Sequence, residues 1–286
     1  MPRIAFVNGT YVPHHQAAVH VEDRGYQFAD GVYEVVLVRK NKMLDMDRHL
    51  DRLERSLSLL EIPMPCHRRA LEQIADRLRR QNLLSYGLIY IQVTRGVTLR
   101  DHAPPADLVA AMQPALVMTT KRLAVPDEAK VAQGVSIITL PDERWARCEI
   151  KTVGLLPNAL AKFKARDAGA FEAWMIDREG FVTEATASNA WIVTKAGKIV
   201  TRQLGPDILA GVTRAVVLQN LGGKWQFEER KFSRDEALDA AEAFITSASS
   251  FVMPVVKIDG QTIGDGKAGS VALTLRKHYL DAADAA

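Results

Sequence analysis

Hydrophobic and polar positions repeat with two different periods along roughly the first 120 residues. Leucines three and four positions apart predict two helices, because residues at that spacing share one helix face. Runs rich in β-branched and aromatic residues predict strands before and after those helices. The helical faces run over 50–60 and 71–78, and the strands over 32–38, 88–94 and 115–119. An Asn8-Gly9 pair between apolar residues predicts a type I′ hairpin turn at the start.

The second half alternates strands and helices less regularly. Strands are expected over 135–139, 171–176, 181–184, 190–193, 244–246 and 255–258, and helices over 157–168, from Gly211, over 233–241 and over 271–279. We expect the three strands between 171 and 193 to form a meander. The order predicts an α/β protein of the two-domain α+β kind, with a smaller first domain and a larger, mixed β second domain with helices. The predicted boundaries are 1–121 for the first domain, 122–128 for a linker that contains Pro126, and 129–286 for the second.

Composition narrows the class of protein. The chain has 286 residues, 48% hydrophobic and 25% charged, and its 37 basic against 34 acidic side chains give a net charge of only +3. That balance argues against a nucleic-acid partner. Two distant cysteines, the lack of a signal-like apolar start and the lack of a long apolar run predict a cytoplasmic protein that does not bind or cross a membrane. The His14-His15 pair lacks a third ligand, so we expect no metal.

Three short stretches carry candidate chemistry. Lys151 lies among apolar neighbours, and a lysine amine withdrawn from water becomes a nucleophile toward carbonyls; the alternative is a lysine that extends to solvent. Glu184 ends a predicted strand beside small hydroxyl residues and could bind a ring nitrogen, or it could belong to an ordinary polar loop. Gly211 precedes an apolar helix whose first N–H groups could bind an anion; the alternative is a plain loop-to-helix junction.

Taken in order, these stretches resemble the fold-type IV pyridoxal-phosphate enzymes. The resemblance covers nearly the whole chain, from Phe6 to about Val256. It is carried by Phe28-Ala29-Asp30-Gly31-Val32-Tyr33-Glu34, His49-Leu50-Asp51-Arg52-Leu53, Arg147-Cys148-Glu149-Ile150-Lys151, Leu209-Ala210-Gly211-Val212-Thr213 and Thr246 to Pro254.

The resemblance implies a role for each matching residue. Lys151 would carry pyridoxal 5′-phosphate as a Schiff base and act as the catalytic residue. Glu184 would pair with the ring nitrogen, and Leu209 would lie against the ring. The phosphate would be held by Arg52, by the backbone N–H groups of Val212 and Thr213, and by a hydroxyl. Ala248 stands where the family has a threonine, so Ser247 or Ser249 would supply that hydroxyl.

Arg100-Asp101-His102 is similar to the carboxylate trap of D-amino-acid aminotransferases. There an Arg-x-His pair and a tyrosine, matched here by Tyr33, bind the substrate carboxylate, since guanidinium bonds a carboxylate with two prongs. In that family the arginine and histidine come from the partner subunit, which implies a homodimer. A solvated loop pair is the alternative for Arg100 and His102.

The implied reaction is ping-pong transamination between a D-amino acid such as D-alanine and a 2-oxo acid such as 2-oxoglutarate. Other functions on the same fold remain open: a branched-chain L-amino-acid aminotransferase, an (R)-amine aminotransferase, or a lyase acting on aminodeoxychorismate. A protein that binds the cofactor without catalysis is the alternative from a different class.

Overall fold

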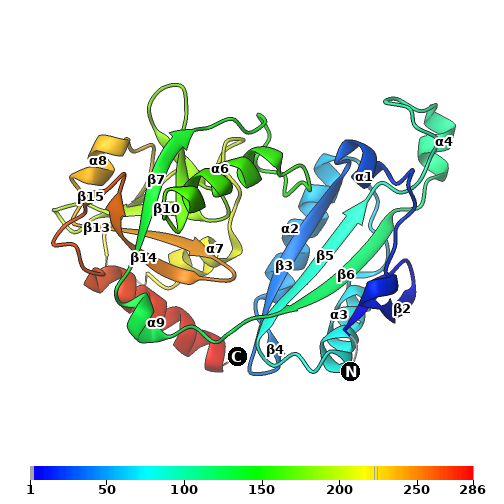
Figure 1. Ribbon diagram of the computed structural model, residues 1–286, viewed down its shortest axis with the longest axis horizontal. Helices are drawn as coiled ribbons and strands as arrows, with labels where there is room; N and C mark the ends of the chain where they lie inside the picture. Colours follow the sequence, from blue (N-terminus) through cyan, green and yellow to red (C-terminus); the bar gives the residue numbers. More distant parts are fainter. Residues whose placement is uncertain (1–2, 222, 224, 286) are drawn as a thin grey trace. The chain divides into compact units, whose positions relative to one another are not determined.

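The computed structural model describes residues 3–221, 223 and 225–285 (Figure 1). The chain forms two compact units, Met1–Val125 with Ile150–Gly154, and Pro126–Glu149 with Leu155–Ala286. The expected domains were continuous stretches, whereas Ile150–Gly154 belongs with the first unit. The reason is backbone bonding: Tyr33 N donates to Lys151 O at 2.9 Å, and Val153 N donates to Gly31 O at 3.1 Å.

The first unit is built on a six-stranded sheet with the order β2-β1-β6-β5-β3-β4. All neighbouring strands are antiparallel. The strands are β1 (Ile4–Val7), β2 (Thr10–Pro13), β3 (Gly31–Arg39), β4 (Lys42–Met43), β5 (Gly87–Thr94) and β6 (Ala115–Arg122). Asn8 (φ 43°) and Gly9 (φ 93°) form the turn between β1 and β2, so the predicted two-residue hairpin is confirmed.

Helices α2 (Met46–Leu59) and α3 (Arg68–Gln81) cover one face of this sheet (Figure 1). Leu50, Leu53 and Leu57 are buried on α2, as their spacing predicts, and they pack against the inward side chains of β3 and β5. Neither of these two helices covers the other face of the sheet. Three short helices lie outside this core: η1 (His14–Gln16), α1 (Arg24–Phe28) and α4 (Ala106–Ala111).

The second unit is built on a nine-stranded sheet. Its main path has the order β12-β11-β10-β13-β14-β7-β8-β9, and β15 pairs with β14. The pairs β14–β7, β7–β8 and β11–β12 are parallel, so the sheet is mixed as predicted. The strands are β7 (Val135–Pro141), β8 (Glu172–Ile176), β9 (Val182–Ala185), β10 (Asn189–Val193), β11 (Ile199–Thr201), β12 (Phe227–Glu229), β13 (Glu242–Ser247), β14 (Phe251–Ile258) and β15 (Gln261–Thr262).

Five helices of the described residues accompany this sheet: α5 (Glu128–Val131), α6 (Leu156–Asp167), α7 (Val212–Gln219), α8 (Arg234–Leu238) and α9 (Ser270–Ala285). α6 has a proline in its first turn and is followed by Gly169 at φ +68°, so both ends follow the sequence signals. α9 packs against β13 and β14 (Figure 1). Within the described part of the chain, every helix is too short or too polar to span a bilayer.

The expected meander is wrong beyond its first pair. β8 and β9 are antiparallel neighbours, but β10 pairs with β11 and β13. The buried Glu172 explains the change of direction, because its carboxylate accepts from Thr186 Oγ1 (2.8 Å), Ala187 N (2.6 Å) and Ser188 Oγ (2.7 Å). These bonds hold the turn after β9 against the start of β8 and direct the chain away from a hairpin.

Candidate active site

Lys151 lies on the sheet face of the first unit that α2 and α3 do not cover. Side chains of extended backbone alternate, and the preceding Ile150 enters the core beneath α2. The half-buried Lys151 therefore projects the other way, where its Nζ lies 4.1 Å from the ring centroid of Tyr33. No hydrogen bond or ion pair between described residues engages this amine. Two of the predicted site residues, Lys151 and Tyr33, are thus brought together.

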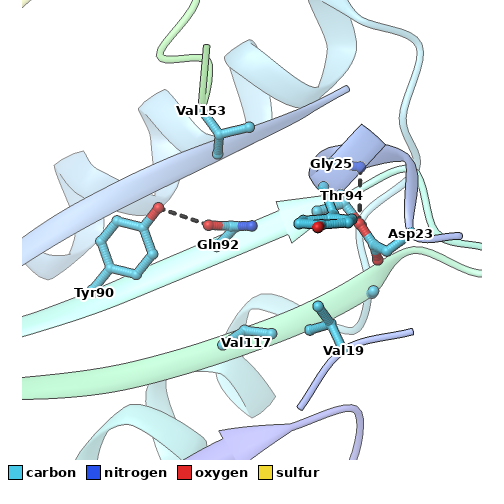
Figure 2. Close-up of a pocket in the computed structure, with 10 residues that line it drawn as sticks. Val19, Asp23, Gly25, Tyr90, Gln92, Thr94, Val117 and Val153 are labelled. Carbon is cyan, nitrogen blue, oxygen red and sulfur yellow. Dashed lines mark hydrogen bonds between the residues drawn. The ribbon is translucent and has the colours of Figure 1, made fainter. Parts of the chain in front are cut away.

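A cavity of about 340 Å³ opens on the same face (Figure 2). Tyr90, Gln92 and Thr94 line it from β5, while the alternate residues of that strand face the helices. Tyr90 stacks on Tyr33 with centroids 5.4 Å apart, and its hydroxyl donates to Gln92 Oε1 at 2.7 Å. Burial, and after it the neighbouring Tyr33, raises the pKa of Tyr90, which keeps it a neutral phenol at working pH. Val153 also lines the cavity.

Arg52 lies on α2 and binds Glu34 of β3. Its Nε and Nη2 donate to the two carboxylate oxygens at 2.7 and 2.8 Å, and His49 Nδ1 lies 2.7 Å from Glu34 Oε2. The Glu34 side chain is fully buried. This two-pronged contact fixes the plane of the Arg52 guanidinium. Sequence reasoning gave Glu34 no role.

Arg100 and His102 lie in the exposed loop between β5 and α4. Their side chains share one neighbour, Phe28: the Arg100 Cζ lies 4.6 Å from the ring centroid and the His102 ring 5.1 Å from it. Both residues therefore contact the same aromatic ring, and their joint role as carboxylate ligands stays a prediction. Among the described residues, no hydrogen bond or ring contact joins either of them to Tyr33.

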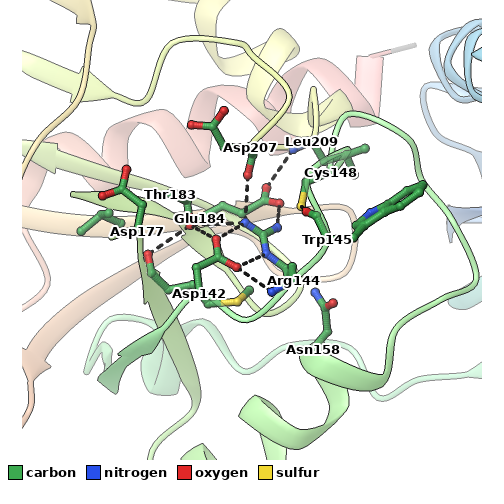
Figure 3. Close-up of polar contacts among 12 residues, drawn as sticks. Asp142, Arg144, Trp145, Cys148, Asn158, Asp177, Thr183, Glu184, Asp207 and Leu209 are labelled. Carbon is green, nitrogen blue, oxygen red and sulfur yellow. Dashed lines mark hydrogen bonds and ion pairs between the residues drawn. The ribbon is translucent and has the colours of Figure 1, made fainter. Parts of the chain in front are cut away.

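Glu184 of β9 lies in a dense polar cluster of the second unit (Figure 3). Its Oε1 pairs with Arg144, and its Oε2 accepts from Asn189 Nδ2 at 3.0 Å and from Leu209 N at 3.1 Å. Asn189 Nδ2 also donates to Leu209 O at 2.9 Å. The structure therefore brings together Glu184 and Leu209, two residues that were predicted separately.

Arg144 is the residue of this cluster that sequence reasoning missed. It donates to Asp142 Oδ1 and Oδ2 at 2.9 and 2.7 Å and to Asp207 O at 2.9 Å, besides its pair with Glu184. Burial opposes the charge of Arg144, but Glu184 and Asp142 outweigh it and raise the pKa of Arg144. The only sequence signal was an acidic-x-basic triplet after β7.

Burial, with the carboxylates nearby, raises the pKa of the Cys148 thiol to about 12, so this thiol remains protonated.

The N-terminus of α7 has the features of an anion site. Gly211 is its N-cap, no side chain caps it, and its first turn holds no acidic residue. A Cβ added at Gly211 would lie 2.1 Å from Asn189 Oδ1, so glycine is needed for this close approach. Val212 and Thr213, whose N–H groups were predicted to bind phosphate, are the first two helical residues, and both are buried.

Ser247 ends β13 and Ser249 lies in the turn between β13 and β14, so the two serines flank Ala248. The Ser247 hydroxyl accepts from Ser250 N at 3.2 Å and lies 3.5 Å from the Ser249 hydroxyl. The preceding Thr246 is buried, and its Oγ1 accepts from Trp191 Nε1 at 2.9 Å. Ser247 and Ser249 are the direct chain neighbours of Ala248, so their hydroxyls are the nearest to it along the chain.

This fold recurs in known enzymes. A branched-chain amino acid aminotransferase from T.th., solved with pyridoxamine 5′-phosphate, superposes with a TM-score of 0.87 at 26% identity, covering 99% of this chain and 94% of that one. A 4-amino-4-deoxychorismate lyase from Pseudomonas aeruginosa gives a TM-score of 0.81 at 28% identity, covering 97% and 98%. The predicted fold is confirmed: the chain has the fold-type IV architecture.

The sequence places the chain more closely within that class. Residues 31–258 match the family described as amino-transferase class IV. A D-alanine aminotransferase from Bacillus licheniformis is 41% identical over 263 residues, which cover 92% of this chain and 90% of the relative. The chain belongs to the class IV aminotransferase family.

Proposed function

We propose that this protein transfers the amino group of a D-amino acid such as D-alanine to a 2-oxo acid such as 2-oxoglutarate, with pyridoxal 5′-phosphate as cofactor. The observation that carries the proposal is the 41% identity, over nearly the whole chain, to a protein named D-alanine aminotransferase. Arg100 and His102 add support, because both contact Phe28 and both carry groups that can donate to a carboxylate.

The residues present fit this cofactor. A half-buried lysine amine over an aromatic ring suits a covalent bond to an aldehyde, and Lys151 is the proposed attachment point. The N-terminus of α7, with Gly211 closely packed on Asn189, suits a phosphate held by the N–H groups of Val212 and Thr213. Arg52 and the Ser247 and Ser249 hydroxyls are the proposed further phosphate contacts.

The proposed role of Glu184 follows from its partners. Its carboxylate accepts from Arg144, Asn189 and Leu209, and these contacts fix its orientation. A carboxylate held in this way is the proposed partner of the ring N–H. Arg144 favours the ionised form of Glu184, and an ionised Glu184 keeps a neighbouring ring nitrogen protonated. Leu209 is positioned through its backbone by the same contacts and is the proposed apolar neighbour of the ring.

When bound, pyridoxal 5′-phosphate supplies the electron sink that makes the substrate Cα proton acidic. Lys151 is the proposed general base, since its amine can take that proton and return one in the reverse half-reaction. Arg100, His102 and Tyr33 are the proposed carboxylate ligands. The hand of the substrate would be set by where they anchor the carboxylate relative to the lysine. We further propose that the protein is a homodimer and works in the cytoplasm.

The test is a panel of amino donors on the purified yellow protein. With 2-oxoglutarate as acceptor, D-alanine should react and L-leucine should not. Turnover of L-leucine instead would make the protein a branched-chain L-amino-acid aminotransferase. Turnover of an (R)-amine at a similar rate would remove the need for a carboxylate. Cofactor colour without turnover of any donor would leave a binding protein.

Lys151→Ala should abolish the visible band that borohydride reduces, whereas a persistent band would place the cofactor on another lysine.

A further inference from the structure

The loop that carries Arg100 and His102 is bound to α1 of its own chain. Arg24 N donates to Gly96 O at 2.9 Å, and Asp23 forms an isolated antiparallel bridge with Val97. The two segments therefore begin side by side, and the contacts continue through the side chain of Arg24.

All three nitrogens of the buried Arg24 guanidinium have acceptors. Nε donates to Asp30 Oδ2 at 2.7 Å, Nη1 to Asp101 O at 2.6 Å and Nη2 to His102 O at 3.3 Å. Asp30 holds the arginine in place, and the other two bonds reach the backbone carbonyls of two successive loop residues, Asp101 and His102. A charge-assisted bond to a backbone carbonyl fixes the main chain whatever side chain it carries.

Phe28, at the end of the same helix, orders the side chains. Its ring contacts three groups: the Arg24 guanidinium at 4.8 Å, the Arg100 guanidinium at 4.6 Å and the His102 ring at 5.1 Å, each measured to the ring centroid. Arg100 and His102 thus rest on one aromatic platform. A guanidinium over an aromatic ring is attracted by the ring's negative face, which limits its rotamers.

The loop also orients its own acidic side chain. Asp101 lies between Arg100 and His102 along the chain, and its Oδ1 accepts from Ala103 N at 3.0 Å within the loop. Across the described residues, no carboxylate forms an ion pair with Arg100. The exposed Arg100 and His102 therefore present their donors to solvent, while the carboxylate between them is engaged by the backbone.

We propose that Arg24 and Phe28 are positioning residues that hold Arg100 and His102 together, so that the substrate carboxylate meets a preformed two-donor site. The inference rests on the proposed function, which assigns carboxylate binding to Arg100 and His102. A preformed site binds more tightly because the loop loses its freedom during folding rather than during binding. Arg24 thereby acts on substrate affinity without touching the substrate.

The chain offers a matched control in Arg95. Like Arg24, it pairs with Asp30, at 2.8 Å, but its other donors reach Leu60 O at 2.7 Å and Glu61 O at 3.1 Å, outside the loop. Arg24→Met and Arg95→Met each remove a similar Asp30 pair, and only the first releases the loop. Phe28→Leu keeps the apolar volume and removes the platform, which covers the case in which Arg24→Met does not fold.

Steady-state kinetics with D-alanine give the first measurement. Arg24→Met should raise KM about tenfold with kcat nearly unchanged, which is the pattern of lost uniform binding. Phe28→Leu should raise KM in the same direction, and Arg95→Met should leave it unchanged. Arg100→Ala should raise KM by about a hundredfold.

Limited trypsin digestion without substrate gives the second measurement. Cleavage after Arg100 reports opening of the loop, and it should be about tenfold faster in Arg24→Met than in Arg95→Met. The inference would be overturned, and the proposed function kept, by one pattern of results. In that pattern Arg24→Met, Phe28→Leu and Arg95→Met have equal KM values and equal cleavage rates, while Arg100→Ala has a large effect. An unchanged KM in Arg100→Ala would refute the carboxylate contact and the inference with it.

Discussion

Glu34 is a carboxylate that no solvent reaches, and its charge survives because two partners surround it. Burial alone would raise its pKa, but the charge and hydrogen bonds of Arg52, with those of His49, lower the pKa of Glu34 to about 2. The group is therefore ionised in the folded protein at any working pH. Its ionised oxygens set the orientation of Arg52, the proposed phosphate ligand.

Replacing Glu34 should change how stability depends on pH. Because its folded pKa of about 2 lies below the ordinary 4.5, the ionised group stabilises the fold fully above about pH 4.5 and loses this effect as pH falls toward 2. The contribution is about 3 kcal/mol. Urea midpoints measured down this range should fall steeply in the unmodified protein and less steeply in Glu34→Gln.

Glu54→Gln is the control for this measurement, since Glu54 lies on the same helix as Arg52 and its side chain is 43% exposed. Its pH profile should match that of the unmodified protein. If the pH profiles of Glu34→Gln and the unmodified protein ran in parallel, the fold would not lower the pKa of the Glu34 carboxyl group.

Some site residues could be predicted from the sequence and others could not. Lys151 has apolar neighbours along the chain, but that pattern alone left both a withdrawn amine and a lysine that extends to solvent open, and the resemblance to fold-type IV enzymes selected it. Arg144 and Glu34 act through partners 40 and 18 positions away, so no local pattern reveals them. The partners of a buried arginine are known only once the fold brings distant segments together.

At the scale of elements, periodicity predicted most of the long helices and strands. It failed where a side chain from elsewhere redirects the chain, as Glu172 does after β9. The predicted strand also began only at Val255, directly after Pro254, a residue that donates no ladder hydrogen bond. The structure extends β14 back to Phe251: β7 pairs only from Val255 onward, so the missing N–H of Pro254 leaves no gap in that pairing.

The start of α7 gives a prediction at this scale. In Gly211→Ala the new methyl group would lie 2.1 Å from Asn189 Oδ1, so Asn189 must move and its bonds to Glu184 and Leu209 must weaken. We expect the dissociation constant for pyridoxal 5′-phosphate to rise about tenfold, since overpacking costs of order 1–3 kcal/mol. An absorbance titration of the cofactor-free protein measures this constant.

Gly205→Ala is the matched control in the same loop. There the added methyl group would meet only Asp207 Oδ1 at 3.4 Å, an ordinary contact. Cofactor affinity should therefore stay unchanged. Equal affinities in the two variants would contradict the need for a close approach at Gly211.

At the scale of the whole molecule, the proposed site residues are divided between the two units. Tyr33, Arg52 and Lys151 belong to the first unit, and Glu184 and the start of α7 belong to the second. The match to the class IV family runs over residues 31–258 and so includes both groups. The order of the family-like stretches along the chain predicted that these residues form one site. Periodicity could not predict it, because it describes one helix or strand at a time.

The proposed homodimer makes a prediction that a monomer does not. If Arg100 serves the lysine of a second subunit, two variants that each lack activity at low D-alanine concentration should restore one another. Lys151→Ala keeps Arg100, and Arg100→Ala keeps Lys151, so a mixed dimer contains one complete site. Unfolding and refolding the two together in equal amounts should recover about a quarter of the normal activity with D-alanine, by random pairing of subunits.

Each variant refolded alone is the control: at a D-alanine concentration near the KM of the unmodified protein, Lys151→Ala should be inactive and Arg100→Ala nearly so. A mixture no more active than the sum of its parts would place Arg100 and Lys151 of each complete site on one subunit.

Because Ile150–Gly154 belongs to the first unit, cutting the chain between the units separates Lys151 from the sheet it lies over. A gene fragment that ends at Val125 would encode every strand of the first sheet yet omit the lysine that lies over it. The complementary fragment would carry that lysine without Gly31 and Tyr33, whose backbone groups bond to its segment. Neither fragment would therefore contain both Lys151 and the strand to which its segment is hydrogen-bonded.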